Sequence, residues 1–171
     1  MQPSLVVLMG VPACGKDYWI NFNNLEPYTI SPDIIRLMIQ NPCITQNGVL
    51  GISQKNNNQV WELVYKFLEG RMQRGDFTII NCTSSKLKDL MQFANLVDVY
   101  KYKFYVLDFS DVPLEVCKQR NRDRADYKFV PEFVLDGMYN RIKNINLSAL
   151  SNVQVIKPDN FWEVFDRKDF V

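Results

Sequence analysis

The chain has 171 residues, of which 47% are apolar and 23% charged, and its formal net charge is +1. This balance is typical of one globular domain and predicts neither disorder nor a global basic field for a nucleic-acid partner. The sequence contains no histidine, which excludes Ser-His-Asp hydrolases, histidine phosphoesterases and His-Glu-x-x-His metalloenzymes. The four cysteines are Cys14, Cys43, Cys82 and Cys117. Their wide spacing favours reduced thiols over a metal site or a disulfide framework.

No apolar stretch approaches the roughly 18 residues that span a bilayer. The first apolar run is not preceded by the basic residues of a signal peptide. We therefore expect a protein of the cytoplasm without a membrane partner. If the chain is phage-encoded, it would act in the cytoplasm of the host.

Short apolar segments alternate with amphipathic segments along the chain. The expected strands are 4–9, 28–30, 77–82, 103–109 and 153–158. The expected helices begin near residues 16, 31, 59, 85, 113, 130 and 161. Residues 41–58 are polar and contain glycine, which predicts a surface loop. This alternation predicts an α/β fold, with a parallel sheet of about five strands covered by helices on both faces, in a single domain over 1–171.

A glycine loop, GVPACGKD, joins the first expected strand to the first expected helix. It follows the P-loop pattern G-x-x-x-x-G-K-[ST] up to the last position. Its backbone N–H groups and the helix N-terminus would face phosphate oxygens, and Lys16 would reach the β- and γ-phosphates. The expected nucleotide-binding residues of the loop are Gly10, Val11, Pro12, Ala13, Cys14, Gly15, Lys16 and Asp17.

Asp17 stands where a Ser or Thr hydroxyl usually holds magnesium. A carboxylate is a stronger oxygen ligand than a hydroxyl, but it also repels phosphate. Asp17 would therefore either bind Mg²⁺, directly or through water, or weaken nucleotide binding in a relict loop. We favour the metal ligand, because two further clusters in the chain point to phosphoryl transfer.

The first of these clusters opens the helix near residue 31. Ser31 suits the N-cap and Pro32 the first helical position. Asp33 and Arg36 follow at i and i+3 on one face. Asp33 would orient a hydroxyl nucleophile and accept its proton, while Arg36 would bind a substrate phosphate. The simpler alternative is a surface ion pair.

The second cluster is the basic segment QRNRDRADYK. Arg120 and Arg124 are four residues apart, with Arg122 between them. Such arginines near a helix end predict a mobile lid, about 118–130, that closes over the triphosphate and stabilises charge in the transition state. A solvated helix end is the alternative. Tyr127 or Phe129 beside the lid would stack on a terminal base or pack the lid against the body.

The ordered motifs together resemble the polynucleotide 5′-hydroxyl kinases, both the phage enzymes and the kinase module of bacterial RNA-repair proteins. They read GVPACGK, SPDIIR, INCTS and RNRDR, followed by VPEFVLDGMY. The resemblance covers residues 4–158. It implies a P-loop phosphotransferase that uses Mg²⁺ and transfers the γ-phosphate of ATP or GTP to the 5′-hydroxyl end of RNA or DNA, in nucleic-acid repair.

The resemblance also implies roles for individual side chains. The implied catalytic residues are Asp33 as general base, with Lys16 and Arg124 on the donor phosphates. The implied substrate-binding residues are Asp33, Arg36 and Thr83. Arg36 would hold the phosphate on the 3′ side of the accepting nucleotide, and Thr83 would line the cleft. Arg120 would be a second lid arginine on the nucleotide.

Two departures from the family pattern concern acids. The end of the third strand has Asn81 and Cys82 where an Asp often stands near the Thr. We hypothesise that the acidic metal ligand has moved from this strand end to the glycine loop, where Asp17 would replace both the usual hydroxyl and the missing strand carboxylate. The D-x-D-G-T motif of the phage 3′-phosphatase domain is also absent. We expect ligase and end-processing partners to be separate proteins, or parts of a longer chain.

Two other functions stay open. A small-molecule or nucleotide kinase of the same fold would need a deep pocket, whereas a polynucleotide needs an open groove. A catalytically dead nucleotide-binding module is suggested by Asp17, although the retained Asp33 and Arg36 argue against it. If the chain is a polynucleotide kinase, its near-neutral charge predicts few phosphate contacts and a shallow salt dependence.

Overall fold

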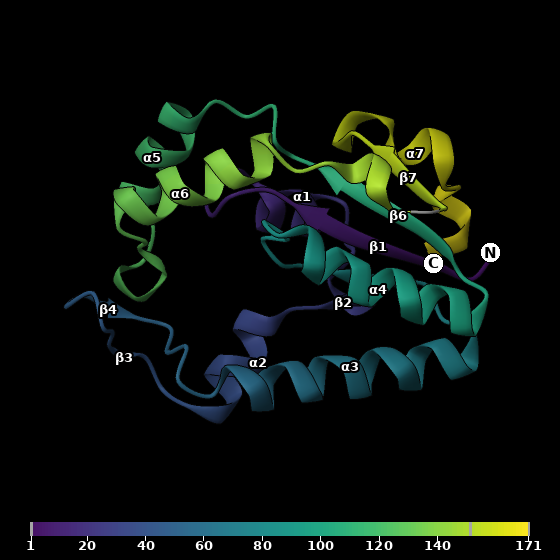
Figure 1. Cartoon of the computed structure of the whole chain (residues 1–171), viewed down its shortest axis with the longest axis horizontal. Helices are drawn as coiled ribbons and strands as arrows, with labels where there is room; N and C mark the ends of the chain where they lie inside the picture. Colours follow the sequence, from purple (N-terminus) through teal and green to yellow (C-terminus); the bar gives the residue numbers. More distant parts are fainter. Residues whose placement is uncertain (1, 151, 171) are drawn as a thin grey trace.

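The computed structural model describes residues 2–150 and 152–170, and a parallel sheet of five strands forms its centre (Figure 1). The strands lie in the order β2-β5-β1-β6-β7. Their bounds are β1 Ser4–Met9, β2 Thr29–Ile30, β5 Thr78–Ile80, β6 Lys103–Asp108 and β7 Val153–Ile156. The expected parallel α/β sheet is therefore confirmed.

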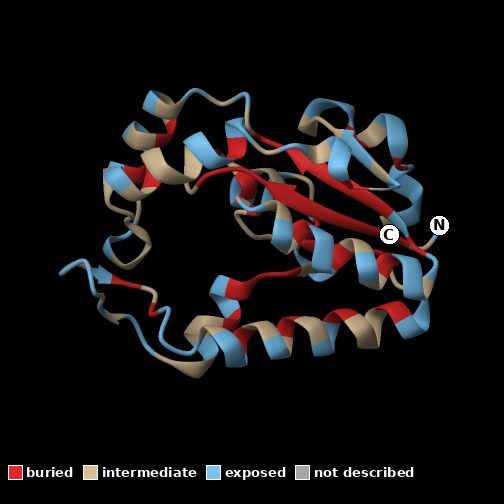
Figure 2. Ribbon diagram, in the orientation of Figure 1, coloured by how far each residue is buried: buried red, intermediate tan, exposed pale blue. Residues whose placement is uncertain are grey.

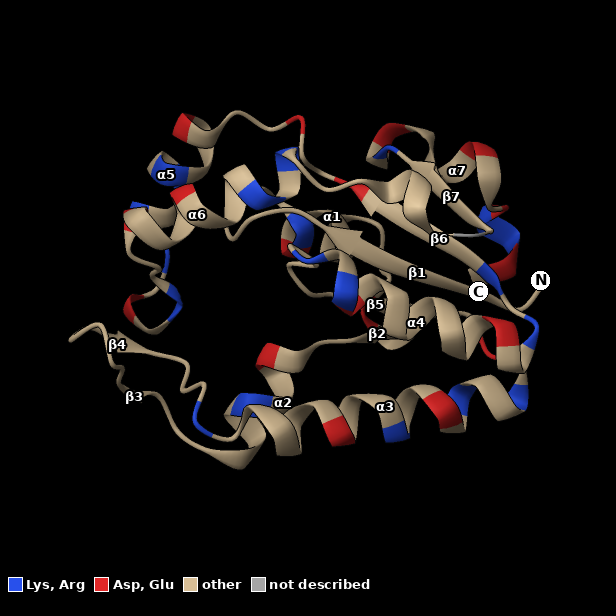
Figure 3. Ribbon diagram, in the orientation of Figure 1, with Lys and Arg blue, Asp and Glu red and all other residues tan. Residues whose placement is uncertain are grey.

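Strand β1 is the centre of the sheet and of the core. It pairs with β5 on one side and with β6 on the other, where the register runs from Ser4 opposite Lys103 to Met9 opposite Asp108. All six residues of β1 are buried and none is charged (Figures 2 and 3). Because the strands are parallel, their carboxyl ends meet at one edge of the sheet, where ligands bind in open α/β folds.

Seven α-helices surround the sheet in the described residues. Their bounds are α1 Lys16–Phe22, α2 Pro32–Ile39, α3 Asn57–Arg74, α4 Leu87–Tyr100, α5 Leu114–Arg122, α6 Glu132–Lys143 and α7 Phe161–Val164. Helices α3 and α4 run along one side of the sheet, and α6 and α7 along the other (Figure 1). None of these helices is long and apolar enough to cross a membrane.

The expected loop at 41–58 contains regular structure. Strands β3 (Cys43–Ile44) and β4 (Leu50–Gly51) form an antiparallel hairpin, and α3 begins at Asn57. Two-residue strands are too short to leave an alternating pattern, and the polar first turn of α3 masks its start. The strand expected at 28–30 is likewise shorter, because Tyr28 belongs to a 3-10 helix.

Candidate active site

The glycine loop leaves the carboxyl end of β1 and enters α1, as expected. Gly15 has a φ of 109° and Ala13 a φ of 64°, both in the left-handed region that glycine adopts without strain. At Gly10 the reason for glycine is space, because a Cβ would lie 2.6 Å from the Cys14 Sγ and 2.9 Å from the Phe109 Cβ. The loop is therefore folded back on itself more tightly than other residues would allow.

Thr83 ties this loop to the next strand. The Gly10 N–H donates a 3.1 Å hydrogen bond to the Thr83 carbonyl oxygen. The segment after β5 thus lies directly against the start of the loop. The contact uses the Thr83 backbone, whereas the predicted role for its side chain stays a prediction.

Lys16 is folded onto the loop that it follows. Its Nζ donates hydrogen bonds of 2.7 Å to the Gly10 carbonyl oxygen and 2.9 Å to the Val11 carbonyl oxygen, and lies 3.6 Å from the Cys14 Sγ. Only 8% of the residue is exposed. The ammonium is thus held at the centre of the loop by carbonyl oxygens, within the motif that would bind the donor phosphates.

Asp17 lies between three segments that are distant in sequence. The Asn81 amide nitrogen donates a 2.7 Å hydrogen bond to the Asp17 Oδ1. The Lys128 Nζ lies 3.9 Å from the Oδ2. The start of α1, the end of β5 and the predicted lid segment, 118–130, therefore meet at this one carboxylate.

The residues at this point fit a magnesium ion carried by a nucleotide. Magnesium is usually held by one or two carboxylates together with phosphate oxygens and water. The Asp17 side chain is 57% exposed, and the Asn81 amide beside it would supply a further oxygen after rotation. No cluster of three or more Cys, Asp or Glu occurs in residues 2–150 and 152–170, so most ligands would come from phosphate and water.

Asp33 and Arg36 occupy the first turns of α2, as the sequence predicts. The Ser31 Oγ caps the helix by accepting a 3.4 Å hydrogen bond from the Ile34 N–H, and Pro32 is the first helical residue. The Arg36 Nη1 donates a 2.9 Å hydrogen bond to the Asp33 Oδ1. Because α2 follows β2 directly, this pair belongs to the same edge of the sheet as the glycine loop.

The two members of the pair differ in exposure. The Asp33 side chain is 62% exposed and the Arg36 side chain only 10%. The Arg36 Nη2 donates a 2.6 Å hydrogen bond to the Asn57 Oδ1 at the start of α3, and its Nε is buried without a partner. Asp33 is thus available to a substrate, whereas Arg36 also joins α2 to α3.

The three lid arginines have different surroundings. The Arg120 Nη1 lies 3.7 Å from the position that a Cβ on Gly15 would occupy, so this guanidinium reaches the glycine loop. The Arg122 guanidinium makes hydrogen bonds of 2.6 and 3.0 Å with the Glu132 Oε1, which raise its pKa. Arg124 is half-buried. Arg120 therefore lies beside the glycine loop, and Arg122 joins α5 to α6.

Asn121 closes the base of the lid. Its side chain is fully buried, and its Nδ2 donates a 2.7 Å hydrogen bond to the Val130 carbonyl oxygen. Its Oδ1 accepts a 3.1 Å hydrogen bond from the Val130 N–H. The Lys118 Nζ, 2.8 Å from the Asp136 Oδ1, adds a second link between α5 and α6. The lid loop therefore starts and ends on a fixed base.

The tip of the lid is the 3-10 helix Asp126–Lys128, which we call the lid tip. It packs against β4 of the hairpin, where a Cβ on Gly51 would lie 4.0 Å from the Tyr127 carbonyl oxygen. Figure 1 shows the lid loop and the hairpin approaching each other from opposite sides of the molecule. The lid tip therefore contacts both the hairpin and, through Lys128, the start of α1.

The comparisons with known proteins agree with this geometry. Residues 5–145 match the family model AAA_33, described as an AAA domain. The chain belongs to this AAA domain family. Among solved structures, a gluconokinase from Sinorhizobium meliloti 1021 is similar, with a TM-score of 0.53 and 16% identity over 91% of this chain and 82% of that one. No curated protein sequence matches the chain.

A second similar structure is described as "a putative kinase" from Chloroflexus aurantiacus J-10-fl. It has a TM-score of 0.61 and 15% identity, and the match covers 99% of this chain and 95% of that one. At these identities the likeness concerns the fold. This AAA domain therefore has the α/β fold of the P-loop kinases, with its glycine loop in the expected place.

Sequence reasoning missed three side chains of the site in this AAA domain. They are Asn57, which holds Arg36; Asn121, which closes the lid base; and Lys128, which faces Asp17. Asn57 is uncharged and lies in a polar stretch without a motif, and Asn121 lies within the RNRDR motif, where the arginines alone were given roles. Lys128 stands within the QRNRDRADYK segment, so the lid prediction included it but gave it no role.

Asp108, another acid at the carboxyl edge of the sheet, makes hydrogen bonds within the fold through both of its oxygens. Asp108 ends β6, and its Oδ2 accepts a 2.7 Å hydrogen bond from the Lys157 Nζ. Its Oδ1 accepts a 2.8 Å hydrogen bond from the Ser110 N–H. Lys157 also lies 2.6 Å from the Asp111 Oδ2, which lowers the pKa of Asp111. With both oxygens engaged, Asp108 fastens the loop after β6 to the segment after β7.

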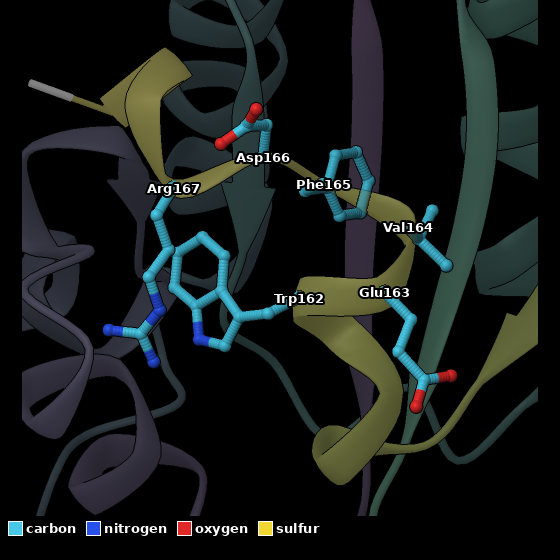
Figure 4. Close-up of a pocket in the computed structure, with 6 residues that line it drawn as sticks. All are labelled: Trp162, Glu163, Val164, Phe165, Asp166 and Arg167. Atoms are coloured by element: carbon cyan, nitrogen blue, oxygen red, sulfur yellow. The ribbon is translucent and has the colours of Figure 1, made fainter.

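The C-terminal segment forms an open depression elsewhere in this AAA domain. It has a volume of about 540 Å³ and is lined by Trp162, Glu163, Val164, Phe165, Asp166 and Arg167 (Figure 4). The Arg167 guanidinium lies 4.5 Å from the Trp162 ring centroid, and the Trp162 Nε1 donates to the Asn23 Oδ1. Its cation and its indole N–H are therefore already partnered within the fold.

Proposed function

We propose that this AAA domain is a polynucleotide 5′-hydroxyl kinase that uses ATP or GTP with Mg²⁺. The observation that carries phosphoryl transfer is the meeting of three parts at one sheet edge. These parts are the glycine loop around Lys16, the exposed Asp33 at the start of α2, and a lid whose Arg120 reaches Gly15. The polynucleotide acceptor rests on the ordered motifs, above all SPDIIR and VPEFVLDGMY.

The reaction follows from these positions. The 5′-hydroxyl oxygen attacks the γ-phosphorus in line with the bond to the β-phosphate, which breaks to release the nucleoside diphosphate. Asp33 orients the hydroxyl and takes its proton as the new phosphate ester forms. Lys16, Arg120 and Arg124 stabilise the charge that spreads over the phosphate oxygens. Bound magnesium would share that charge, held from the protein side by Asp17.

Arg36 would meet the phosphate that follows the accepting nucleotide. Its guanidinium now bonds Asp33 and Asn57, so phosphate would replace one of these partners rather than fill an empty site. The small number of such contacts agrees with the net charge of +1. The enzyme would then act on ends made available by other repair proteins, such as a separate ligase or end-processing enzyme.

A second candidate is a small-molecule kinase. The similarity in fold to a gluconokinase favours it, although the identity of 16% leaves the acceptor pocket undetermined. In this case Asp33 would accept the proton of a sugar or nucleoside hydroxyl instead.

Acceptor competition separates the two functions. The protein is incubated with γ-labelled ATP or GTP and Mg²⁺, with 5′-hydroxyl RNA or DNA, the same oligonucleotides carrying a 5′-phosphate, nucleosides, mononucleotides or gluconate. We expect label only on the 5′-hydroxyl oligonucleotides. Label on gluconate or mononucleotides alone would establish the second candidate, and label on no acceptor, with no magnesium-dependent triphosphate binding, would establish a dead module.

Matched variants exclude a contaminating kinase. Lys16→Ala and Asp33→Asn should each abolish most of the transfer. The controls are Lys88→Ala and Asp98→Asn, which change exposed residues of α4. Equal activity in all four variants would show that the label does not come from this site.

A further inference from the structure

The lid tip is held at two points. On one side the Tyr127 backbone lies against Gly51 of the hairpin. On the other side the Lys128 Nζ lies 3.9 Å from the Asp17 Oδ2. The lid base is fixed independently by Asn121 and Val130. Lys128 is therefore kept beside the glycine loop by the surrounding backbone as well as by its own charge.

The charge on Asp17 requires a partner. A carboxylate at the start of a phosphate-binding loop opposes the phosphate oxygens, whereas the usual hydroxyl is neutral. Asn81 donates a hydrogen bond but brings no charge. In the part of the chain that the structure describes, Lys128 is the cation within 4.0 Å of this carboxylate. The acid of the loop and the cation of the lid thus balance each other in the ligand-free protein.

This pair contributes little to the stability of the fold. The Lys128 side chain is 39% exposed and the Asp17 side chain 57%, and ion pairs in contact with solvent are weak. The ammonium is therefore easily transferred to a stronger anionic partner. A triphosphate bound at the loop would be such a partner, because Asp17 belongs to that loop.

We propose that Lys128 is a further donor-binding residue, held on Asp17 until a magnesium–triphosphate complex occupies the loop. When Asp17 takes the magnesium ion as its partner, Lys128 turns to the phosphate oxygens and keeps the lid tip closed. The lid therefore exchanges a contact with the protein for a contact with the nucleotide. This inference rests on the proposed phosphate donor and is independent of the acceptor.

Nucleotide binding without an acceptor tests the donor contact. Calorimetric titration with a non-hydrolysable ATP or GTP analogue and Mg²⁺ compares wild type with Lys128→Met and Lys128→Arg. The control, Lys66→Met, changes an exposed lysine of α3. We expect about tenfold weaker binding for Lys128→Met, the loss of one charge-assisted contact. Lys128→Arg should bind within about threefold of wild type, and Lys66→Met should equal it. Equal affinity of Lys128→Met and wild type would overturn the proposal.

Hydrogen exchange of residues 123–130 tests the exchange of partners. Without metal or nucleotide, Asp17→Asn and Lys128→Met should each speed the exchange of this segment, and the double variant should be no faster than either single variant. With magnesium and the analogue, the wild-type segment should stay protected while that of Lys128→Met does not. Additive effects of the two single changes would show that Asp17 and Lys128 act separately, contrary to the proposal.

The role of Lys128 and the proposed function can be disproved independently of each other. If oligonucleotides are not phosphorylated but Lys128→Met loses donor affinity, the acceptor is wrong and the role of Lys128 stands. If oligonucleotides are phosphorylated and Lys128→Met binds the donor like wild type, the kinase stands and the role of Lys128 falls.

Discussion

The Asn81 Nδ2 donates a 2.7 Å hydrogen bond to the Asp17 Oδ1, joining the end of β5 to the start of α1. In the sequence, these two residues are linked only because each departs from a family pattern. Their contact shows that the acid at 17 and the amide at 81 occupy the same small space. An acid on either residue would therefore face the same bound ion.

Because of this contact, the hypothesis of a moved metal ligand can be tested by moving the carboxylate from position 17 to position 81. Asp17→Ser should lower the apparent magnesium affinity of the donor complex by about 10–100-fold, the range for the loss of a side chain in the outer shell of a metal. Adding Asn81→Asp to Asp17→Ser should restore much of it, because the carboxylate returns from the other side. Magnesium titrations of nucleotide binding measure both. Unchanged or better activity of Asp17→Ser at low magnesium would contradict the hypothesis.

Asp33→Asn should lower the turnover number while leaving the stability of the fold nearly unchanged. The side chain is mostly exposed and its ion pair with Arg36 is local, so the free energy of unfolding should change by less than about 1 kcal/mol. The turnover number should fall by about 10²–10⁴, the contribution typical of a general base. Steady-state kinetics and urea unfolding measure the two quantities. A drop in donor affinity equal to the drop in turnover would show that Asp33 binds nucleotide instead.

Asn57→Ala should show how much the hydrogen bond between Arg36 and Asn57 contributes to the stability of the fold. It removes the acceptor of the Arg36 Nη2 hydrogen bond in a nearly buried guanidinium, which should cost about 1–3 kcal/mol of stability. The matched control is Asn58→Ala, the exposed neighbour in the same helical turn. Urea unfolding of both variants gives the difference. Equal stability of the two would mean that Arg36 does not depend on Asn57 and is free to bind substrate.

Asn121→Ala should loosen the lid at its base. It leaves the Val130 N–H and carbonyl without their partners in a buried place, at a cost of about 1–3 kcal/mol. Limited proteolysis should then cut within 123–129 faster than in wild type or in Asn95→Ala, an exposed asparagine of α4. Unchanged cleavage would place the hinge of the lid elsewhere.

The fold was predictable because its signals are local and strong. The apolar runs LVVLM and FYVL form most of the two central neighbours β1 and β6. The start of α2 was predictable because Ser31 is a favoured N-cap residue and Pro32 a favoured first helical residue. Helix α3 buries a stripe formed by Val60, Val64, Leu68 and Met72. Val60 faces the core there, while Trp61 lies half-buried against Tyr65 and Phe93.

The site was predictable only in its charged and glycine positions. Motif spacing identified Lys16, Asp17 and Asp33, and the structure gathers their elements at one edge of the sheet. It could not identify Asn57 or Lys128 as partners, because these contacts join elements far apart in sequence. It also could not foresee that Arg36 is mostly buried, because an arginine at i+3 from an acid is usually solvated.

Two of the C-terminal aromatic residues, Phe165 and Phe170, pack at the end of the sheet opposite the glycine loop. Phe170 lies against Tyr28 and Phe77, the residues immediately before β2 and β5, and Phe165 also packs on Phe77. The aromatic packing and the glycine loop thus lie at opposite ends of the sheet. Charges at the glycine-loop end can therefore be rearranged with little effect on the packed end, as the hypothesis of a moved acidic ligand requires.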